Sequence, residues 1–189
     1  MFIACKKAIK KSRGNINIQV PIDLRKYYET KTVKNFSMYC GIKLPIGEID
    51  DISSIIDKIK KQLTEKTSRA SMEKMVTHIG KISNKIKYVP LFVKKPIAKI
   101  GFELYGERIF TNTLSNIGIV KFPTSISEKI EYLDGIVYPQ NLNRAGCLVI
   151  TCNNTTTFTI NKRTNNPTFE KEMKELLEKD GLQVIVQDQ

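Results

Sequence analysis

The sequence is short of the side chains that most often carry enzyme chemistry. It contains one histidine, His78, and no carboxylate lies three or four positions away to orient that ring. We therefore interpret His78 as an incidental polar residue on the flank of a helix. The chain also has no G-x-S-x-G motif, no phosphate-binding glycine loop and no pair of carboxylates in a shared apolar setting. The residues alone predict no self-sufficient catalytic centre and no catalytic residue.

Patterns typical of metal sites and disulfides are missing as well. The four cysteines, Cys5, Cys40, Cys147 and Cys152, are scattered, without a C-x-x-C pair and without clustered histidines to complete a zinc site. We expect these cysteines to be reduced, small core residues. We expect no bound metal and no permanently bound cofactor.

Long hydrophobic runs are also absent. No apolar run approaches the length that spans a membrane, and the first residues, MFIACKKAIKK, have too short an apolar run for a signal peptide. A length of 189 residues with 41% apolar residues suits one globular domain, residues 1–189, with a buried core. We therefore expect a cytoplasmic protein without a membrane span.

The net charge of +12 raises the question of nucleic-acid binding, because basic side chains that neutralise phosphates release counterions. Only six of the 31 basic residues are arginine, however, and base-edge recognition favours the planar guanidinium group. The lysines are spread over the chain and do not form one block. The charge therefore gives no reason to expect nucleic acid as the partner.

Hydrophobic periodicity predicts an α/β chain. Helices are expected at 2–11, from Asp50 or Asp51 to about 63, from about Ser71 to 86, at 94–105 and at 166–181. Strands are expected at 15–20, 36–44, 109–112, 117–121, 135–138, 146–152, 156–160 and 182–186, with Asn153-Asn154 as a two-residue hairpin. Because strands and helices do not strictly alternate, the order favours a mixed β-sheet covered by helices.

Two segments stand out from this pattern. In PIDLRKYY, Asp23 and Arg25 flank an apolar leucine, which predicts a buried ion pair that fixes the loop between two strands. The second segment, SNIG at 115–118, is predicted to form a turn between two strands. Ser115 and Asn116 then either hydrogen-bond local backbone, with Gly118 permitting close approach, or present a hydroxyl and an amide to a substrate cleft.

The order of these motifs resembles a known family. Pro21–Arg25, Asn35-Phe36, the SNIG segment and Pro123 match, in order and spacing, the C-terminal half of alcohol O-acetyltransferase-like proteins. These proteins belong with chloramphenicol acetyltransferase, wax ester synthase and the condensation domains of peptide synthetases. The resemblance covers nearly the whole chain and implies one half, the C-terminal subdomain, of the chloramphenicol acetyltransferase-like fold.

The departure from that family lies in its catalytic motif. Such enzymes consist of two related α/β halves, and the general-base histidine comes from an HHxxxDG motif in the first half. This chain has no HxxxD anywhere, since residue 82, four after His78, is isoleucine. The chain therefore resembles the second half alone, and a first helix that starts at Met1 without a cap is consistent with that interpretation.

The resemblance implies transfer of an acyl group, with acetyl-CoA or another acyl-CoA as co-substrate, to a small alcohol or amine. Ser115 and Asn116 would bind substrate, whereas Asp23, Arg25, Asn35 and Gly118 would form the structural motif. The expected partner is an N-terminal acyltransferase half or, through exposed apolar surface, a second copy in a dimer. The half alone would be inactive. The alternative is a non-enzymatic interaction or regulatory module that kept the fold.

Overall fold

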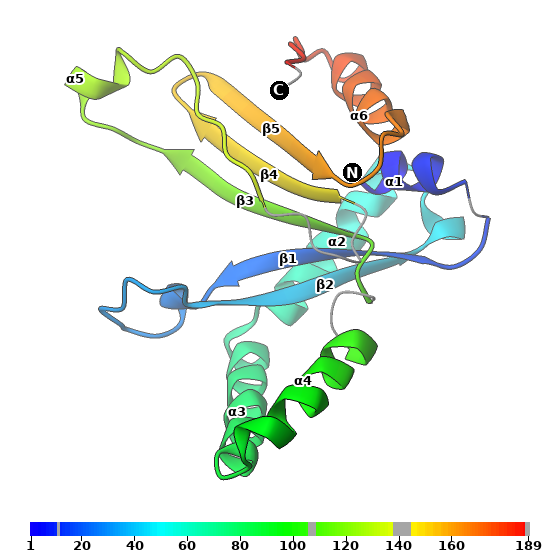
Figure 1. The fold of residues 1–189 in the computed structure, drawn as a ribbon. Helices are drawn as coiled ribbons and strands as arrows, with labels where there is room; N and C mark the ends of the chain where they lie inside the picture. The colour runs from blue at the N-terminus through cyan, green and yellow to red at the C-terminus, as the bar shows by residue number, and fades with distance from the viewer. Residues whose placement is uncertain (11, 106–108, 138–144, 188–189) are drawn as a thin grey trace.

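The computed structural model describes residues 1–10, 12–105, 109–137 and 145–187 (Figure 1). In this part of the chain, five strands form one sheet in the order β2-β1-β3-β4-β5. The strands are β1 (Asn15–Asp23), β2 (Ser37–Pro45), β3 (Asn112–Val120), β4 (Ala145–Cys152) and β5 (Thr155–Lys162). Strand β1 runs antiparallel to β2 and parallel to β3, and β4 runs parallel to β3 and antiparallel to β5. The sheet is therefore mixed, as the sequence predicts.

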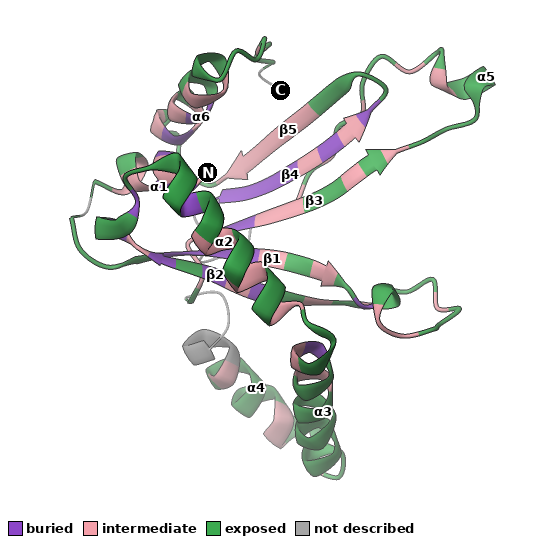
Figure 2. Cartoon of the chain, turned by 180° about the vertical axis from the view of Figure 1, so that it is seen from behind, coloured by how far each residue is buried: buried purple, intermediate pink, exposed green. Residues whose placement is uncertain are grey.

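The helices are α1 (Phe2–Ile9), α2 (Ile52–Lys66), α3 (Arg69–Ile86), α4 (Leu91–Tyr105), the short α5 (Thr124–Ser127) and α6 (Thr168–Lys179). Two single 3-10 turns, η1 (Leu24–Lys26) and η2 (Ile46–Glu48), follow β1 and β2. Helices α1, α2 and α6 cover one face of the sheet, whereas α3 and α4 form a hairpin that projects away from it (Figures 1 and 2). The predicted covering of a mixed sheet by helices is confirmed on this face.

The main core lies between the sheet and helices α1, α2 and α6. Successive strand residues point to opposite faces, so alternate apolar positions of β1 and β2 share the helical face. Their fully buried members are Ile16 and Ile18 of β1 and Ile42 and Leu44 of β2. Helix α2 contributes Ile55, α6 contributes Phe169 and Met173, and α1 contributes Phe2, Ala4 and Cys5. This two-layer packing holds β1 at the centre of the fold.

The second face of β1 differs from the sequence prediction. Alternation predicts that Asn17 and Gln19 lie on a solvated face, but both side chains are buried. Residues 109–113 cover them: Asn17 Nδ2 donates to the Ile109 carbonyl at 3.0 Å, and Thr113 Oγ1 donates to Gln19 Oε1 at 2.9 Å. Residues 16–19 of β1 are therefore buried on both faces, as in a central strand. The bonds pair the Asn17 amide nitrogen and the Gln19 carbonyl oxygen, whereas Asn17 Oδ1 is buried without a hydrogen-bond partner among the described residues.

Several predicted element boundaries are confirmed by their caps. Asp51 accepts a hydrogen bond from the Ser54 backbone N–H at 2.9 Å at the start of α2. Asn166 accepts one from the Thr168 N–H at 3.0 Å before α6, and Gly181 follows α6 with a positive φ of 83°. Asn153, with φ 51°, turns the chain between β4 and β5. Local side-chain chemistry therefore sets these ends.

The strands expected in the second half of the chain are only partly correct. Of the strand predicted at 109–112, only Asn112 belongs to a strand; β3 starts there and continues through residues 117–120 of the next predicted strand, because pairing with β4 extends along it. Residues 135–137 and 182–186 form no strand, and Tyr138 lies outside the described residues. Gly135 instead packs over β4, where an added Cβ would lie 2.8 Å from Leu148 Cδ2. The segment around Gly135 thus covers the second face of the sheet as an irregular layer.

The helix predicted at 94–105 begins earlier than expected, at Leu91 instead of Lys94. The Pro90 carbonyl accepts hydrogen bonds from the Val93 and Lys94 N–H groups, both at 3.0 Å, so Pro90 marks the helix start. Pro96 consequently lies inside α4, beyond the first turn, where proline is best tolerated. Among the described residues, no helix has both the length and the apolar character needed to cross a membrane.

The outer edge of β2 is covered by a side chain of α2. Gln62 Nε2 donates to the Lys43 carbonyl at 2.8 Å, and Gln62 Oε1 accepts from the Lys43 N–H at 3.1 Å. Lys66 Nζ also donates to the Gly41 carbonyl. These bonds satisfy backbone groups that an edge strand would otherwise present to solvent.

Candidate functional site

The SNIG segment lies inside β3, so the prediction of a turn between two strands is wrong. A bulge interrupts the pairing between Asn116 and Gly118, leaving Ile117 unpaired. Asn116 Oδ1 accepts a hydrogen bond from the Gly118 N–H at 2.9 Å, which accounts for the local, turn-like pattern. Gly118 has φ 82°, and nothing lies within 4 Å of an added Cβ. The glycine at this position therefore allows the positive φ of the bulge, and it is not needed for the close approach of another segment.

Ser115 and Asn116 do not lie on the same face of the sheet. In the register of β3 with β4, Ser115 pairs with Leu148 and Asn116 with Val149, so their side chains point to opposite faces of the sheet. Asn116 shares the helical face with Leu114, whereas Ser115 shares the other face with Thr113. A single substrate on one face of the sheet can meet only one of the two candidate residues.

Asn116 lines a groove that opens where β1 and β3 separate. The two strands pair only at Ile18 with Asn112 and at Gln19 with Thr113, and beyond these positions they diverge (Figure 1). The groove has a volume of about 370 Å³. Its walls come from α1, α2 and strands β1 to β3, and its lining residues are Met1, Phe2, Ile3, Ile18, Val20, Ile42, Ile52, Ile55, Ile56, Ile59, Leu63, Leu114 and Asn116.

The chemistry of this groove is simple. Of the described side chains that line it, all are apolar except the amide of Asn116, and none is ionisable. Apolar walls with one polar group at a fixed position suit a ligand with an aliphatic chain and one hydrogen-bonding group. The groove can therefore bind and orient such a ligand, while its side chains supply no proton-transfer group.

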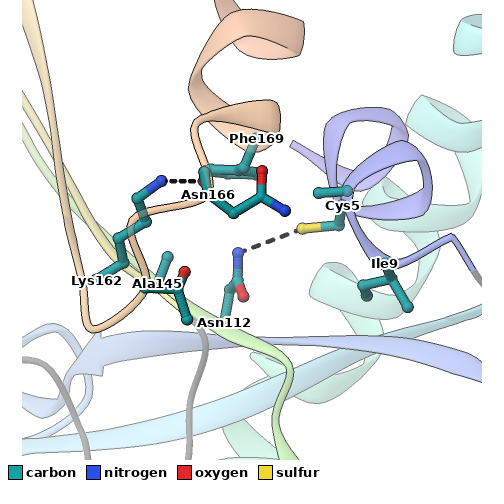
Figure 3. Close-up of a pocket in the computed structure, with 9 residues that line it drawn as sticks. Cys5, Ile9, Asn112, Ala145, Lys162, Asn166 and Phe169 are labelled. Atoms are coloured by element: carbon teal, nitrogen blue, oxygen red, sulfur yellow. Dashed lines mark hydrogen bonds between the residues drawn. The ribbon is translucent and has the colours of Figure 1, made fainter.

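A second cavity, of about 230 Å³, lies between α1, the start of β4 and the loop before α6 (Figure 3). Asn112, which is 2% exposed, donates from Nδ2 to the Cys5 sulfur at 3.3 Å, while its Oδ1 has no hydrogen-bond partner among the described residues. Lys162 bonds the Asn166 carbonyl and forms an ion pair with Glu170. Because Asn112 Oδ1 borders the cavity, it can accept a hydrogen bond from a small donor there, such as a water molecule.

The loop after β1 contains the predicted ion pair between Asp23 and Arg25. Arg25 Nη1 lies 3.1 Å from Asp23 Oδ1, and Nη2 donates to the carbonyls of Thr32 and Lys34 at 3.2 and 2.7 Å. Both side chains are exposed, so the expected burial is wrong, while Leu24 between them is buried. The Arg25 backbone and side chain lower the pKa of Asp23 by hydrogen bonding. Arg25 thus stabilises the loop mainly through backbone carbonyls.

Asn35 lies at the far end of the same loop. Its Oδ1 accepts a hydrogen bond from the Ser37 hydroxyl at 2.7 Å at the start of β2. Next to it, the Phe36 carbonyl accepts from the Leu24 N–H at 3.0 Å, which joins the two ends of the loop. Asn35 and Phe36 therefore hold the two ends of the loop together, and neither residue lines the groove.

Removing the Arg25 side chain is expected to open this loop to proteolysis. In Arg25→Ala, the carbonyls of Thr32 and Lys34 lose their guanidinium donor, so trypsin should cleave after Lys31 and Lys34 several-fold faster. Limited digestion followed by mass spectrometry measures these rates. Arg69→Ala is the matched control, because Arg69 forms its ion pair with Glu73 on α3, away from this loop. Equal cleavage in both variants would contradict the role given to Arg25.

The remaining candidate groups are placed away from the groove. His78 is exposed on α3, and all four cysteines are buried and form no disulfide bond with one another. Burial raises the pKa of Cys147 to about 12 and also raises that of Cys40. Within the described ranges, no group of three or more His, Cys, Asp and Glu side chains could hold a metal ion.

Sequence reasoning missed Asn112 and the buried polar pairs of β1 and β3. Asn112 falls where one predicted strand ends, and only the tertiary packing of α1 and α6 around it reveals the cavity. Comparison with known proteins adds no family: no family model matches this chain, and no curated protein matches it.

Proposed function

We propose that the chain is the C-terminal half of a CoA-dependent acyltransferase, which transfers an acetyl or related acyl group to an alcohol or amine. In this proposal the chain binds part of the substrate, and a half carrying the HHxxxDG motif supplies the general base. The proposal is supported by the motifs described above and by the mixed sheet with helices on one face.

The observation that carries the proposal is the groove between β1 and β3. It brings Asn116, a residue of the SNIG segment, beside apolar side chains of α1 and α2. An acyl chain would bury its methylene groups against Ile52, Ile56 and Leu114, and the Asn116 amide would hydrogen-bond the carbonyl of the thioester. Asp23, Arg25, Asn35 and Gly118 shape the loop and the bulge at the ends of the two strands that form the groove.

Binding of acyl-CoA by the chain alone is the direct test. Isothermal titration with octanoyl-CoA should show binding, because the groove needs no second half to accept an aliphatic chain. Asn116→Ala should weaken binding about fivefold, the expected effect of one lost hydrogen bond. Ser115→Ala is the matched control and should bind as the unchanged protein does, because Ser115 faces the other side of the sheet.

The same protein should release no thiol from acetyl-CoA with simple alcohols. Turnover should appear only when an HHxxxDG-bearing half is supplied. Robust turnover by residues 1–189 would contradict the proposal that a second half supplies the general base. Absence of acyl-CoA binding, or equal loss of binding in both variants, would favour a non-enzymatic module instead.

A further inference from the structure

The α3–α4 hairpin, Arg69–Tyr105, has features that the proposed function does not use. It projects from the body of the protein, and both views show its turn far from the sheet (Figures 1 and 2). Its base is fixed by Met72, which is fully buried, and by the Tyr27 hydroxyl, which donates to the Thr67 carbonyl at 2.7 Å. The far end therefore extends into solvent from a fixed base.

The described apolar side chains of the hairpin are largely exposed. At the turn, Tyr88, Leu91 and Phe92 are 85%, 65% and 77% exposed. Behind the turn, Ile79, Ile82 and Ile86 of α3 and Ile97 and Ile100 of α4 are also exposed. At helical spacing the three isoleucines of α3 share one stripe with Met72, yet of these four residues only Met72 is fully buried. Many exposed apolar side chains on one projecting element mark an interaction site.

The charged residues of the hairpin are mostly basic, and its two acidic residues, Glu73 and Glu103, lie near its ends. Residues 74–102 contain seven lysines and no aspartate or glutamate, although the chain as a whole contains 19 acidic residues. At 100° per residue, Lys74, Lys81 and Lys85 lie opposite the apolar stripe of α3, so this helix is amphipathic. On α4, Lys95 and Lys99 lie opposite Ile97 and Ile100 and on the same side as Leu91 and Phe92, so the lysines of α4 flank its exposed apolar residues.

We propose that the α3–α4 hairpin binds an anionic membrane surface. Tyr88, Leu91 and Phe92 enter the boundary between headgroups and acyl chains, and the lysines bind the anionic headgroups. Lys87 already lies over the Tyr88 ring, 5.7 Å from its centroid, so a cation sits beside an inserting aromatic side chain. The charge and the exposed apolar turn together specify a partner that is both anionic and apolar.

Two other occupants fit these observations less well. A nucleic acid would neutralise the lysines but would leave Leu91 and Phe92 in water. A second copy docked hairpin to hairpin would bring two acid-free, lysine-rich segments together and so incur repulsion between like charges. A lipid bilayer with anionic headgroups accommodates both the charge and the apolar turn.

Flotation with lipid vesicles tests the proposal. The protein should float with phosphatidylcholine vesicles that contain phosphatidylserine, and added salt or removal of phosphatidylserine should weaken this binding about tenfold. The double variant Leu91→Ser/Phe92→Ser should weaken it about tenfold as well. Ile119→Ser/Ile136→Ser is the matched control, because both isoleucines are 70% exposed outside the hairpin. Circular dichroism verifies that each variant is folded.

Charge variants test the role of the lysines separately from that of the exposed apolar residues. Lys95→Glu/Lys99→Glu should abolish the preference for phosphatidylserine, whereas the exposed pair on α2, changed in Lys60→Glu/Lys61→Glu, should retain it. A tryptophan provides a second readout, because the sequence contains none. Fluorescence of Phe92→Trp should shift to shorter wavelength on vesicles, and that of Val33→Trp, at a 98% exposed position, should not.

Three results would overturn the proposal. The first is an equal loss of vesicle binding in the hairpin variants and their controls, or no binding at all. The second is a lipid-independent dimer that Leu91→Ser/Phe92→Ser dissociates, which would assign the surface to a second copy. The third is retention on duplex DNA at the same salt without vesicle binding, which would assign the lysines to nucleic acid.

Discussion

Replacing Ile42 with alanine should destabilise the fold by about 3 kcal/mol, the typical cost of a large-to-small change in a packed core. Ile42 lies on β2 opposite Ile18, is 1% exposed, and packs in the core beneath α2. Its loss removes apolar burial and leaves a cavity that the two-layer packing can fill only in part. Urea unfolding followed by far-UV circular dichroism measures the change in the free energy of unfolding.

Ile136→Ala is the control for this result. Ile136 is exposed, so the same chemical change there should alter the free energy of unfolding by no more than about 0.5 kcal/mol. If the two variants unfold alike, the core does not lie between the sheet and α2. A cost much larger at Ile136 would point to an interface on that side of the molecule.

Cys147 should react with iodoacetamide about a thousandfold more slowly in the folded protein than in the denatured chain. Burial raises its pKa from 9.0 to about 12, so at pH 8 the thiolate fraction falls by about three powers of ten, and the thiolate is the reactive form. Quenched time points analysed by peptide mass spectrometry give the rate at Cys147 itself. A folded rate within tenfold of the denatured rate would contradict the buried position.

The same shift predicts a pH dependence of stability. The folded pKa lies above the unfolded value, so the neutral thiol favours the folded state fully below pH 9, and this contribution is lost as the pH rises from 9 toward 12. Over that range the slope from this one group is about 1.4 kcal/mol per pH unit. The difference in the free energy of unfolding between Cys147→Ala and the unchanged protein, measured across this pH range, isolates the contribution of Cys147, because the variant lacks this thiol.

Local signals predicted most of the elements. Asp51, Asn166 and Gly181 mark helix ends because their side chains or their positive φ act within a few residues, and such effects are visible in the sequence. The apolar alternation of β1 and β2 was sufficient to predict both strands. Recognition of a mixed sheet followed from the order of these elements.

The errors come from tertiary structure. Asn17 and Gln19 looked solvated because alternation cannot tell an exposed polar face from one covered by a distant segment. The SNIG segment resembled a turn because Asn116 bonds the backbone two residues on, as it does in turns, yet pairing with β4 keeps β3 extended. A strand assignment would have placed Ser115 and Asn116 on opposite faces, which the turn assignment concealed.

Gln62 also determines where this sheet can be extended. Its amide occupies the hydrogen-bonding positions at Lys43 that an incoming peptide strand would need, and Lys66 holds the next available carbonyl, that of Gly41. Strand addition beside β2 must first displace both side chains of α2. Any β-augmentation, by a copy of the chain or by a foreign peptide, is therefore directed to the opposite border of the sheet, at β5.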